Sequence, residues 1–372
     1  IAMWGGMSDW ELIKNLQDNH NSLRKYLLEN KIQYGSGLHP KENESNKMQI
    51  EGYHIDTGKI EAYYTPKKNT EKITKKEFRR NNLKLFKQPL VVIKEGITNK
   101  NILSSYFDFD VFYNKAVYGF ATDDSSKLKS IAIILNSNLS SYFFFLTSSS
   151  WGVERDRIVL TEYLNFPYSE LDLNSLEKIN FAETSFEKES SLLNQKQKLF
   201  DFQNWEKIIN KQYKITDNDV TRIFDTVSLS IDLFHKQEKS IALYPVQKNQ
   251  TAEYAEIIIS ELNDFLDGQD LFVNATVFYN IGRFTPLMMI KLSHSQTKRD
   301  IEISNEQVDD ELRKLDKHLW EEKSSNIYFR KKLNYKTDND IYIIRPNQRR
   351  FWSKSMAIED ASELILEILN ED

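Results

Sequence analysis

The fold is decided by a stretch near the middle of the chain, residues 128–167, which reads LKSIAIILNSNLSSYFFFLTSSSWGVERDRIVLTEYLNFP. Its apolar residues recur at helical spacing as far as residue 146, so this part predicts one long helix. The polar run at 147–152 ends that helix, because serine and glycine favour turns and loops. Arg155 and Arg157 follow directly. The stretch therefore predicts a core helix followed by a polar loop.

Strands precede this helix in the sequence. Residues 89–94, PLVVIK, form a short apolar run that predicts a buried strand. Residues 111–121, VFYNKAVYGFA, predict a second pair of strands, and we expect the helix at 128–146 to pack against them.

The N-terminal part predicts a helix and a long loop. Residues 1–4 resemble the tail of a strand, and a helix is predicted over 9–28. Ser8 has the position of an N-cap, with Glu11 at capping-box spacing. Residues 34–58 are rich in Gly, His, Asn and Ser and predict a loop with short strands.

The C-terminal third has a mixed pattern. Residues 170–240 are charged and helix-prone, which predicts a helical connector. Beyond residue 241 the pattern predicts helices near 251–266, 305–322 and 358–370, and strands near 271–279, 286–292, 326–333 and 340–345. The expected fold class is therefore α+β, with a mixed-sheet domain, a helical connector and a C-terminal α+β module.

Composition excludes several classes of protein. The formal net charge is −5, from 50 basic and 55 acidic residues, so any nucleic-acid site must be local. The absence of cysteine excludes disulfides and Cys-ligated zinc and favours a cytoplasmic location. No apolar run approaches the roughly 18 residues of a membrane span, so neither a membrane partner nor secretion is expected.

Catalytic motifs are missing from the sequence. The seven prolines include no adjacent pair, which excludes the Asn/Asp-Pro-Pro-Tyr/Phe segment that holds a flipped adenine. There is no Walker loop, no His-Glu-x-x-His and no Gly-x-Ser-x-Gly. The six histidines are dispersed, so no metal site is predicted and each is expected to be structural or exposed. We expect no catalytic residue in this chain, although scattered carboxylates leave a nuclease site in the tail open.

Basic residues concentrate between residues 59 and 100. This segment holds twelve lysines and arginines against four acidic residues. Such a run can neutralise phosphates, or it can be an ordinary solvated face. Its candidate DNA-binding residues are Lys67, Lys68, Lys75, Lys76, Arg79, Arg80 and Lys94, with Lys72, Lys84 and Lys87 among their basic neighbours.

The loop at 148–157 is the second candidate site. Ser149, Trp151, Arg155 and Arg157 combine hydroxyl, aromatic and guanidinium groups in one short segment. Arginine can read guanine bidentately in the major groove, and serine can bind phosphates or bases. Alternatively, Arg155 pairs with a neighbouring carboxylate on the surface.

Residues 1–170 resemble the target-recognition region of bacterial N6-adenine DNA methyltransferases and of restriction enzymes fused to them. The similar elements are Leu135-Asn136-Ser137, the aromatics at 142–145, Gly152 and Phe166-Pro167. Upstream, QPLVVIKEG at 88–96 is similar to a strand of that family. Residues 1–16 are similar to the segment that follows the catalytic domain.

This resemblance implies a domain that docks on double-stranded DNA and selects the site whose adenine is flipped and methylated. It implies that Asn136 and Gly152 hold the helix end and the loop. S-adenosylmethionine and catalysis would belong to a methyltransferase domain of a longer parent, of which this chain would be a fragment. A restriction or defence subunit would be a further partner.

The last residues add a weaker resemblance. Residues 341–369 are similar to the C-terminal ending of methylase-like proteins of host-defence loci. A second DNA surface or a docking patch could form there from Arg345, Arg349, Arg350, Phe351, Trp352 and Lys354.

Four segments follow from these patterns and resemblances. We predict a methyltransferase remnant at 1–30, a target-recognition domain at 31–170, a connector at 171–240 and an α+β module at 241–372. The predicted function is recognition of a duplex DNA sequence for a methylation or restriction system. The alternative is a protein-interaction module without base reading, and salt-dependent DNA binding separates the two.

Overall fold

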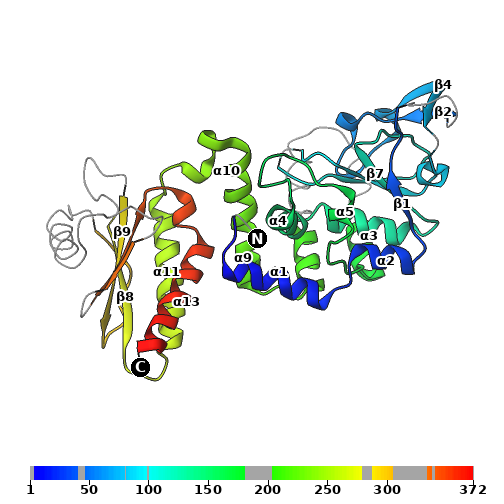
Figure 1. The fold of residues 1–372 in the computed structure, drawn as a ribbon. Coiled ribbons are helices and arrows are strands. Elements are labelled where there is room, and N and C mark those ends of the chain that lie inside the picture. Colours follow the sequence, from blue (N-terminus) through cyan, green and yellow to red (C-terminus); the bar gives the residue numbers. More distant parts are fainter. Residues whose placement is uncertain are drawn as a thin grey trace. The chain divides into compact units, whose positions relative to one another are not determined.

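The computed structural model describes residues 4–40, 47–79, 81–98, 100–180, 203–278, 287–304, 333–336 and 340–371. The chain forms two compact units, Ile1–Val227 and Ser228–Asp372 (Figure 1). Each unit combines helices with a five-stranded sheet, which confirms the predicted α+β class.

The first unit is built on a sheet of order β1-β7-β5-β6-β3. Its central strand β5 (Leu90–Lys94) is fully buried, as the apolar run predicts, and pairs antiparallel with β7 (Val117–Ala121) and β6 (Ser104–Phe107). The edge strands are β1 (Gln33–Ser36), antiparallel to β7, and β3 (Tyr63–Tyr64), parallel to β6. Only β7 forms a strand within 111–121; Phe112 and Tyr113 instead hold neighbouring loops through backbone bonds to Ile55 and Leu38.

The long helix predicted at 128–146 is two helices, α3 (Ser125–Leu135) and α4 (Asn138–Thr147). Asn136 ends α3: its amide donates to the carbonyls of Ala132 (2.6 Å) and Ser104 (2.7 Å) and accepts the Ser104 N–H (3.1 Å). Ser137 then caps α4 by accepting the Ser140 N–H. These two side chains break the helix because they satisfy backbone groups at its ends.

The N-terminal helix is also divided, into α1 (Met7–Asn19) and α2 (Leu23–Glu29). The Asp9 carboxylate accepts the Gly6 N–H at 2.7 Å, so α1 begins before the predicted cap Ser8. Ser22 caps α2 and accounts for the break. The predicted strand tail at 1–4 falls on residues of which 1–3 lie outside the described part.

The helix α5 (Leu160–Tyr163) lies just before the predicted connector. Within the connector the first unit has α6 (Leu173–Asn180), a helical segment at 203–212, and α9 (Asp217–Asp225). Residues 181–202 of the connector lie outside the described part. Within the described helices no single one is long and apolar enough to cross a membrane; α3 and α4 together have the length and composition, but they meet at 63°.

The second unit has a sheet of order β10-β8-β9-β12-β11. Its strands are β8 (Phe272–Phe278), β9 (Leu287–Ser295), β10 (Glu302–Ser304), β11 (Leu333–Lys336) and β12 (Asp340–Pro346), and only the β10–β8 pair is parallel. Two long helices, α11 (Lys248–Phe265) and α13 (Lys354–Glu371), lie along one face of this sheet (Figure 1) and share one apolar core with it. The short helix α10 (Ile231–Lys236) precedes them.

These elements match the strands predicted near 271–279, 286–292 and 340–345 and the helices predicted near 251–266 and 358–370. The helix predicted at 305–322 lies outside the described residues. So does the strand predicted at 326–333, except for Leu333, where β11 begins.

Candidate nucleic-acid interface

A two-stranded ribbon is formed by a strand from the segment at 34–58 and a strand from the basic stretch, a pairing that the sequence did not predict. β2 (Lys47–His54) and β4 (Glu71–Arg79) pair antiparallel with each other and form a sheet of their own (Figure 1). β2 lies within residues 34–58, where a loop with short strands was predicted, and β4 carries the middle of the basic stretch. The ribbon forms because alternate residues of β2 are apolar.

One face of the ribbon packs on the first unit. Ile50 is buried, and Met48, Ile73 and Phe78 pack against the same core, which also contains Leu90 and Val92 of β5 and Phe86 of the 3-10 turn η4 (Leu83–Phe86). This contact fixes the register, because a shift by one residue would turn the apolar set toward solvent.

The other face of the ribbon is polar. Gln49, Glu51 and Tyr53 of β2 are exposed, and the register places Lys72 opposite Tyr53 and Glu77 opposite Gln49. The register shifts between Ile50 and Gly52, where β4 holds one residue more than β2. Such a bulge increases the local twist of a ribbon.

Several cations gather on and beside the ribbon. We call the exposed Lys67, Lys68, Lys72, Lys76 and Arg79 the ribbon surface. Lys67, in the 3-10 turn η3 (Lys67–Asn69), holds its Nζ 4.2 Å from the Tyr53 ring centroid, and Lys76 lies 5.6 Å from that of Phe78. Within the described residues, none of the four lysines has an acidic partner. Their charges are therefore available to an external anion.

The other basic candidates differ in accessibility. Lys75 lies in β4, and Arg80 lies outside the described residues. Lys94 is only 7% exposed: its ammonium donates to Thr98 Oγ1 at 2.7 Å, and burial lowers its pKa. Burial at the end of β5 removes Lys94 from the set that can touch a phosphate.

Two hollows are lined by basic residues of the first unit, and one of them adjoins the ribbon. One, of about 400 Å³, runs along residues 49–53 of β2 and is closed by Leu83, Phe112 and Lys87 among others. The second, of about 340 Å³, is lined by Lys31, Lys84 and Lys87 at the start of β5. Lys87 lines both and pairs with Asp110. Lys31 thus joins two lysines of the basic stretch in lining the second hollow, which Asp123 also lines.

The loop at 148–157 is held by hydrogen bonds from its serines to Glu162 of α5. Glu162 accepts hydrogen bonds from the Ser148 hydroxyl and from the Ser149 hydroxyl and N–H. Trp151 is fully buried with its ring 5.5 Å from that of Phe145, so it is no candidate for contact with DNA. Ser149 is exposed, but its polar groups are already bonded.

Both arginines of the loop have acidic neighbours. The Arg155 Nε lies 3.4 Å from Glu154 Oε1, and the Arg157 Nη1 lies 3.6 Å from Glu95 Oε1. This is the surface-pairing alternative to base reading. Because these groups are exposed or half-buried, such pairs are weak and can open.

Gly152 sets the path of the loop. It has φ of +81°, and a Cβ there would lie 2.8 Å from the Phe145 carbonyl oxygen. Asn136 holds the end of α3 through the bonds already described. The structural roles that the family resemblance implied for Asn136 and Gly152 are therefore confirmed.

The ribbon and the loop contact different parts of the first unit. The ribbon shares a core with Leu90 and Val92, whereas their neighbours Val91 and Ile93 are not part of that core. Alternate side chains of a strand point to opposite faces of its sheet. The loop follows α4, and backbone bonds tie it to residues 95–97, just after β5. The ribbon and the loop are thus held by different contacts.

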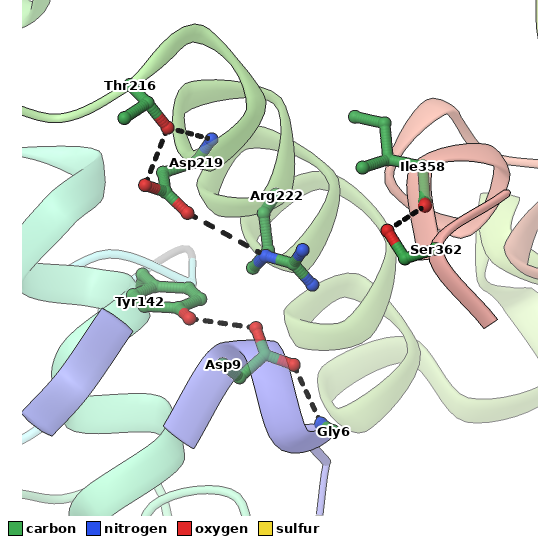
Figure 2. A network of polar contacts seen from close by, with 8 residues as sticks. All are labelled: Gly6, Asp9, Tyr142, Thr216, Asp219, Arg222, Ile358 and Ser362. Carbon is green, nitrogen blue, oxygen red and sulfur yellow. Dashed lines mark hydrogen bonds and ion pairs between the residues drawn. The ribbon is translucent and has the colours of Figure 1, made fainter. Parts of the chain in front are cut away.

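Two separate groups of polar contacts lie among the helices of the first unit (Figure 2). The Tyr142 hydroxyl of α4 donates to Asp9 of α1 at 2.8 Å, and burial raises the pKa of that hydroxyl. On α9, Arg222 lies 4.0 Å from Asp219, which accepts a hydrogen bond from the Thr216 hydroxyl. Each carboxylate oxygen of Asp9 accepts one hydrogen bond, so Asp9 has a structural role: it ties the start of α1 to α4.

The basic patch predicted in the tail does not form. Arg345 is fully buried: its guanidinium pairs with Asp360 and donates to the Phe351 carbonyl at 2.8 Å. Trp352 and Phe351 are buried in the core of the second unit, and Lys354 pairs with Glu253. Arg349 and Arg350 are half-buried. The prediction of a second DNA surface here is wrong for Arg345, Phe351 and Trp352, because their side chains face inward.

No group of three or more metal-ligating side chains comes together within the described ranges. No known family matches the sequence, and no curated protein does. Among solved structures the chain is weakly similar to the S subunit of a type I restriction-modification system from M. genitalium. The TM-score is 0.24 and the identity 9%, over 95% of this chain and 92% of that chain. A TM-score of this size does not establish a common fold.

Proposed function

We propose that this chain binds duplex DNA and recognises its sequence for a restriction-modification or related host-defence system. The observation that carries the proposal is the ribbon surface, where four exposed lysines have no acidic partner in the described part of the chain. A net charge of −5 gives no general attraction to DNA, so this local cluster must supply it.

Phosphate contacts explain what such a cluster would do. Each DNA phosphate that a lysine neutralises releases condensed counterions, and the logarithm of affinity falls with the logarithm of salt by about 0.9 per contact. Four lysines of the ribbon surface would contribute a slope of about 3 to 4.

The finer part of the proposal concerns the enzyme that this chain serves. We infer an N6-adenine methyltransferase, supported by the sequence resemblance at 88–96 and 128–167. Methyl transfer and S-adenosylmethionine would belong to a catalytic domain on the same polypeptide, and a restriction or defence subunit would join the complex. We also infer a bacterial, cytoplasmic protein.

Salt-titrated binding to duplex DNA tests the proposal. The test variant reverses charge at Lys67, Lys68, Lys72 and Lys76 (each →Glu). The matched control reverses four exposed lysines elsewhere in the first unit, Lys14, Lys25, Lys115 and Lys211.

We expect the ribbon variant to lose most affinity and to flatten the salt slope for every duplex, while the control changes little. Equal effects of the two variants, or no DNA binding by the unaltered chain, would overturn the proposal. The interaction-module alternative would then stand.

A further inference from the structure

We propose that the β2–β4 ribbon enters the major groove and that Gln49 and Glu51, on its outward face, read base edges. This inference rests on the proposed function, since it names the element by which the same surface selects a sequence.

The ribbon has the dimensions of a groove reader. Paired strands lie about 4.7 to 4.9 Å apart, and the major groove, about 12 Å wide, admits a two-stranded ribbon with its side chains. Within the described residues β2 and β4 form a two-stranded sheet, and the one further contact of its strands in the β-bridge pattern is an isolated bridge between His54 and Phe112 at one end. Its inward face is held by the core through Ile50, Ile73 and Phe78, which leaves the outward face rigidly presented.

The chemistry of the outward face differs from that of a phosphate-binding surface. Phosphates offer only acceptors and negative charge, so such a surface needs donors and cations. Gln49 and Glu51 supply acceptors at its centre, and within the described residues Glu51 has no cationic partner. A carboxylate there would be repelled by phosphates, but it can accept from cytosine N4, and an amide can bind adenine bidentately.

The cations lie where the backbone of the DNA would pass. Lys72 and Lys67 lie beside Tyr53 at one end of the ribbon, and Arg79 lies at the far end of β4. Lys76 lies in the middle of β4, but it is opposite Ile50 and so belongs to the face that carries Ile50. On the face of Gln49 and Glu51, the acceptors lie between Lys72 and Arg79, the order expected with bases in the middle and phosphates at the margins.

The hollow beside β2 leaves room for this contact. It runs along residues 49–53. At the far end of β2 the Phe112 N–H donates to the Tyr53 carbonyl at 2.8 Å, so only the part of β2 around Gln49 and Glu51 faces the hollow. Leu83 lines the hollow and is 51% exposed, which gives an apolar contact suited to a thymine methyl group. By contrast, the polar groups of the loop at 148–157 already bond within the protein.

To test this, the full chain is used to select DNA duplexes from a randomised library. The affinity for the selected site and its dependence on salt are then measured. The variants are Gln49→Ala and Glu51→Ala. The matched controls are Gln17→Ala and Glu11→Ala, exposed residues of the same types on α1.

We expect each ribbon variant to lose preference at one or two base positions. The expected loss in discrimination is about 10- to 100-fold, with an unchanged salt slope and an unchanged melting temperature. An unaltered selected sequence for both ribbon variants would overturn this inference while leaving DNA binding intact. Absence of any DNA binding by the unaltered chain would instead overturn the proposed function.

Discussion

Asn136 shows how much one side chain can decide. Its amide binds both backbone groups of Ser104 in β6 and also ends α3, so it joins the helical layer to the sheet. Each of these bonds is buried, and a buried polar group that loses its partner costs about 1 to 3 kcal/mol.

We predict that Asn136→Ala lowers the free energy of unfolding of the first unit by about 2 to 4 kcal/mol, because Ser104 would lose two partners. Urea unfolding followed by tryptophan fluorescence measures this. Asn138→Ala is the control, since only the backbone of Asn138 is seen to bond. Equal destabilisation by both changes would show that the Asn136 side chain does not join α3 to the sheet.

Glu206 gives a residue-scale prediction about pH. It accepts the Asn138 N–H at the start of α4, and burial raises its pKa from 4.5 to about 7. Between these values the folded chain holds a proton that the unfolded chain has released. The contribution of Glu206 to stability is therefore present below about pH 4.5, falls as pH rises to about 7, and is flat above.

The change Glu206→Gln keeps an acceptor for the Asn138 N–H but cannot ionise. We expect the variant to gain stability relative to the unaltered chain as pH rises from 4.5 to 7. Unfolding free energies of the two proteins at a series of pH values give that difference, in which the histidines cancel. A difference that does not change with pH would mean that the folded carboxyl titrates normally.

At the scale of elements, the contacts of the loop at 148–157 indicate a structural role. Ser148 accepts the N–H groups of Ser150 and Trp151, and Gly152 turns the chain back over Phe145. Backbone bonds of Ile97 and Ile158 then tie the loop to the segment after β5. A loop fixed in this way holds α4 and the sheet together.

We predict that Gly152→Ala destabilises the first unit by about 1 to 3 kcal/mol, because the residue is left-handed and its Cβ would meet the Phe145 carbonyl. Gly58→Ala is the matched control, since a Cβ at Gly58 meets nothing within 4 Å. Thermal unfolding compares them. If both variants melt together with the unaltered protein, the loop is looser than its contacts indicate.

The exposed Arg155 tests whether this loop also reads DNA. Its partner Glu154 is equally exposed, and such pairs contribute about 0 to 1 kcal/mol. We expect Arg155→Ala to leave both stability and the selected sequence unchanged. If Arg155→Ala relaxes the base preference in the selection experiment, the loop does contact bases, which is one of the two interpretations that the sequence left open.

At the scale of the whole molecule, the two units have separate cores. The core of the second unit contains the Arg345–Asp360 pair, whose two side chains are fully buried, with the Tyr254 hydroxyl donating to the same carboxylate. Removing one partner of a buried ion pair leaves the other charge uncompensated and costs about 3 to 5 kcal/mol.

We therefore predict that Asp360→Ala lowers the melting transition of the second unit and leaves the DNA salt slope of the first unit unchanged. Calorimetry and salt-titrated binding measure the two effects. Glu367→Ala, an exposed position on α13, is the control. A loss of DNA binding in Asp360→Ala would show that the second unit supports the interface.

The sequence alone determined the parts that depend on local pattern. The apolar runs of β5, β9 and β12 and the helical spacing of α11 and α13 are enough to predict these elements, because a strand or helix reveals its buried face within a few residues. The α+β class follows from their order. The basic excess near residues 59–100 was also visible, since charge is read directly from composition.

Only the tertiary structure decided where the candidate site lies. β2 and β4 pair across 17 to 32 residues of sequence, a contact that no local period specifies. The sequence analysis treated Lys94, Trp151 and Arg345 as surface groups, but all three are buried. Their burial depends on which distant residues cover them. Long-range packing also gave the ribbon and the loop different supports. The ribbon shares a core with Leu90 and Val92, whereas backbone bonds tie the loop to residues 95–97, and the order along the chain shows neither contact.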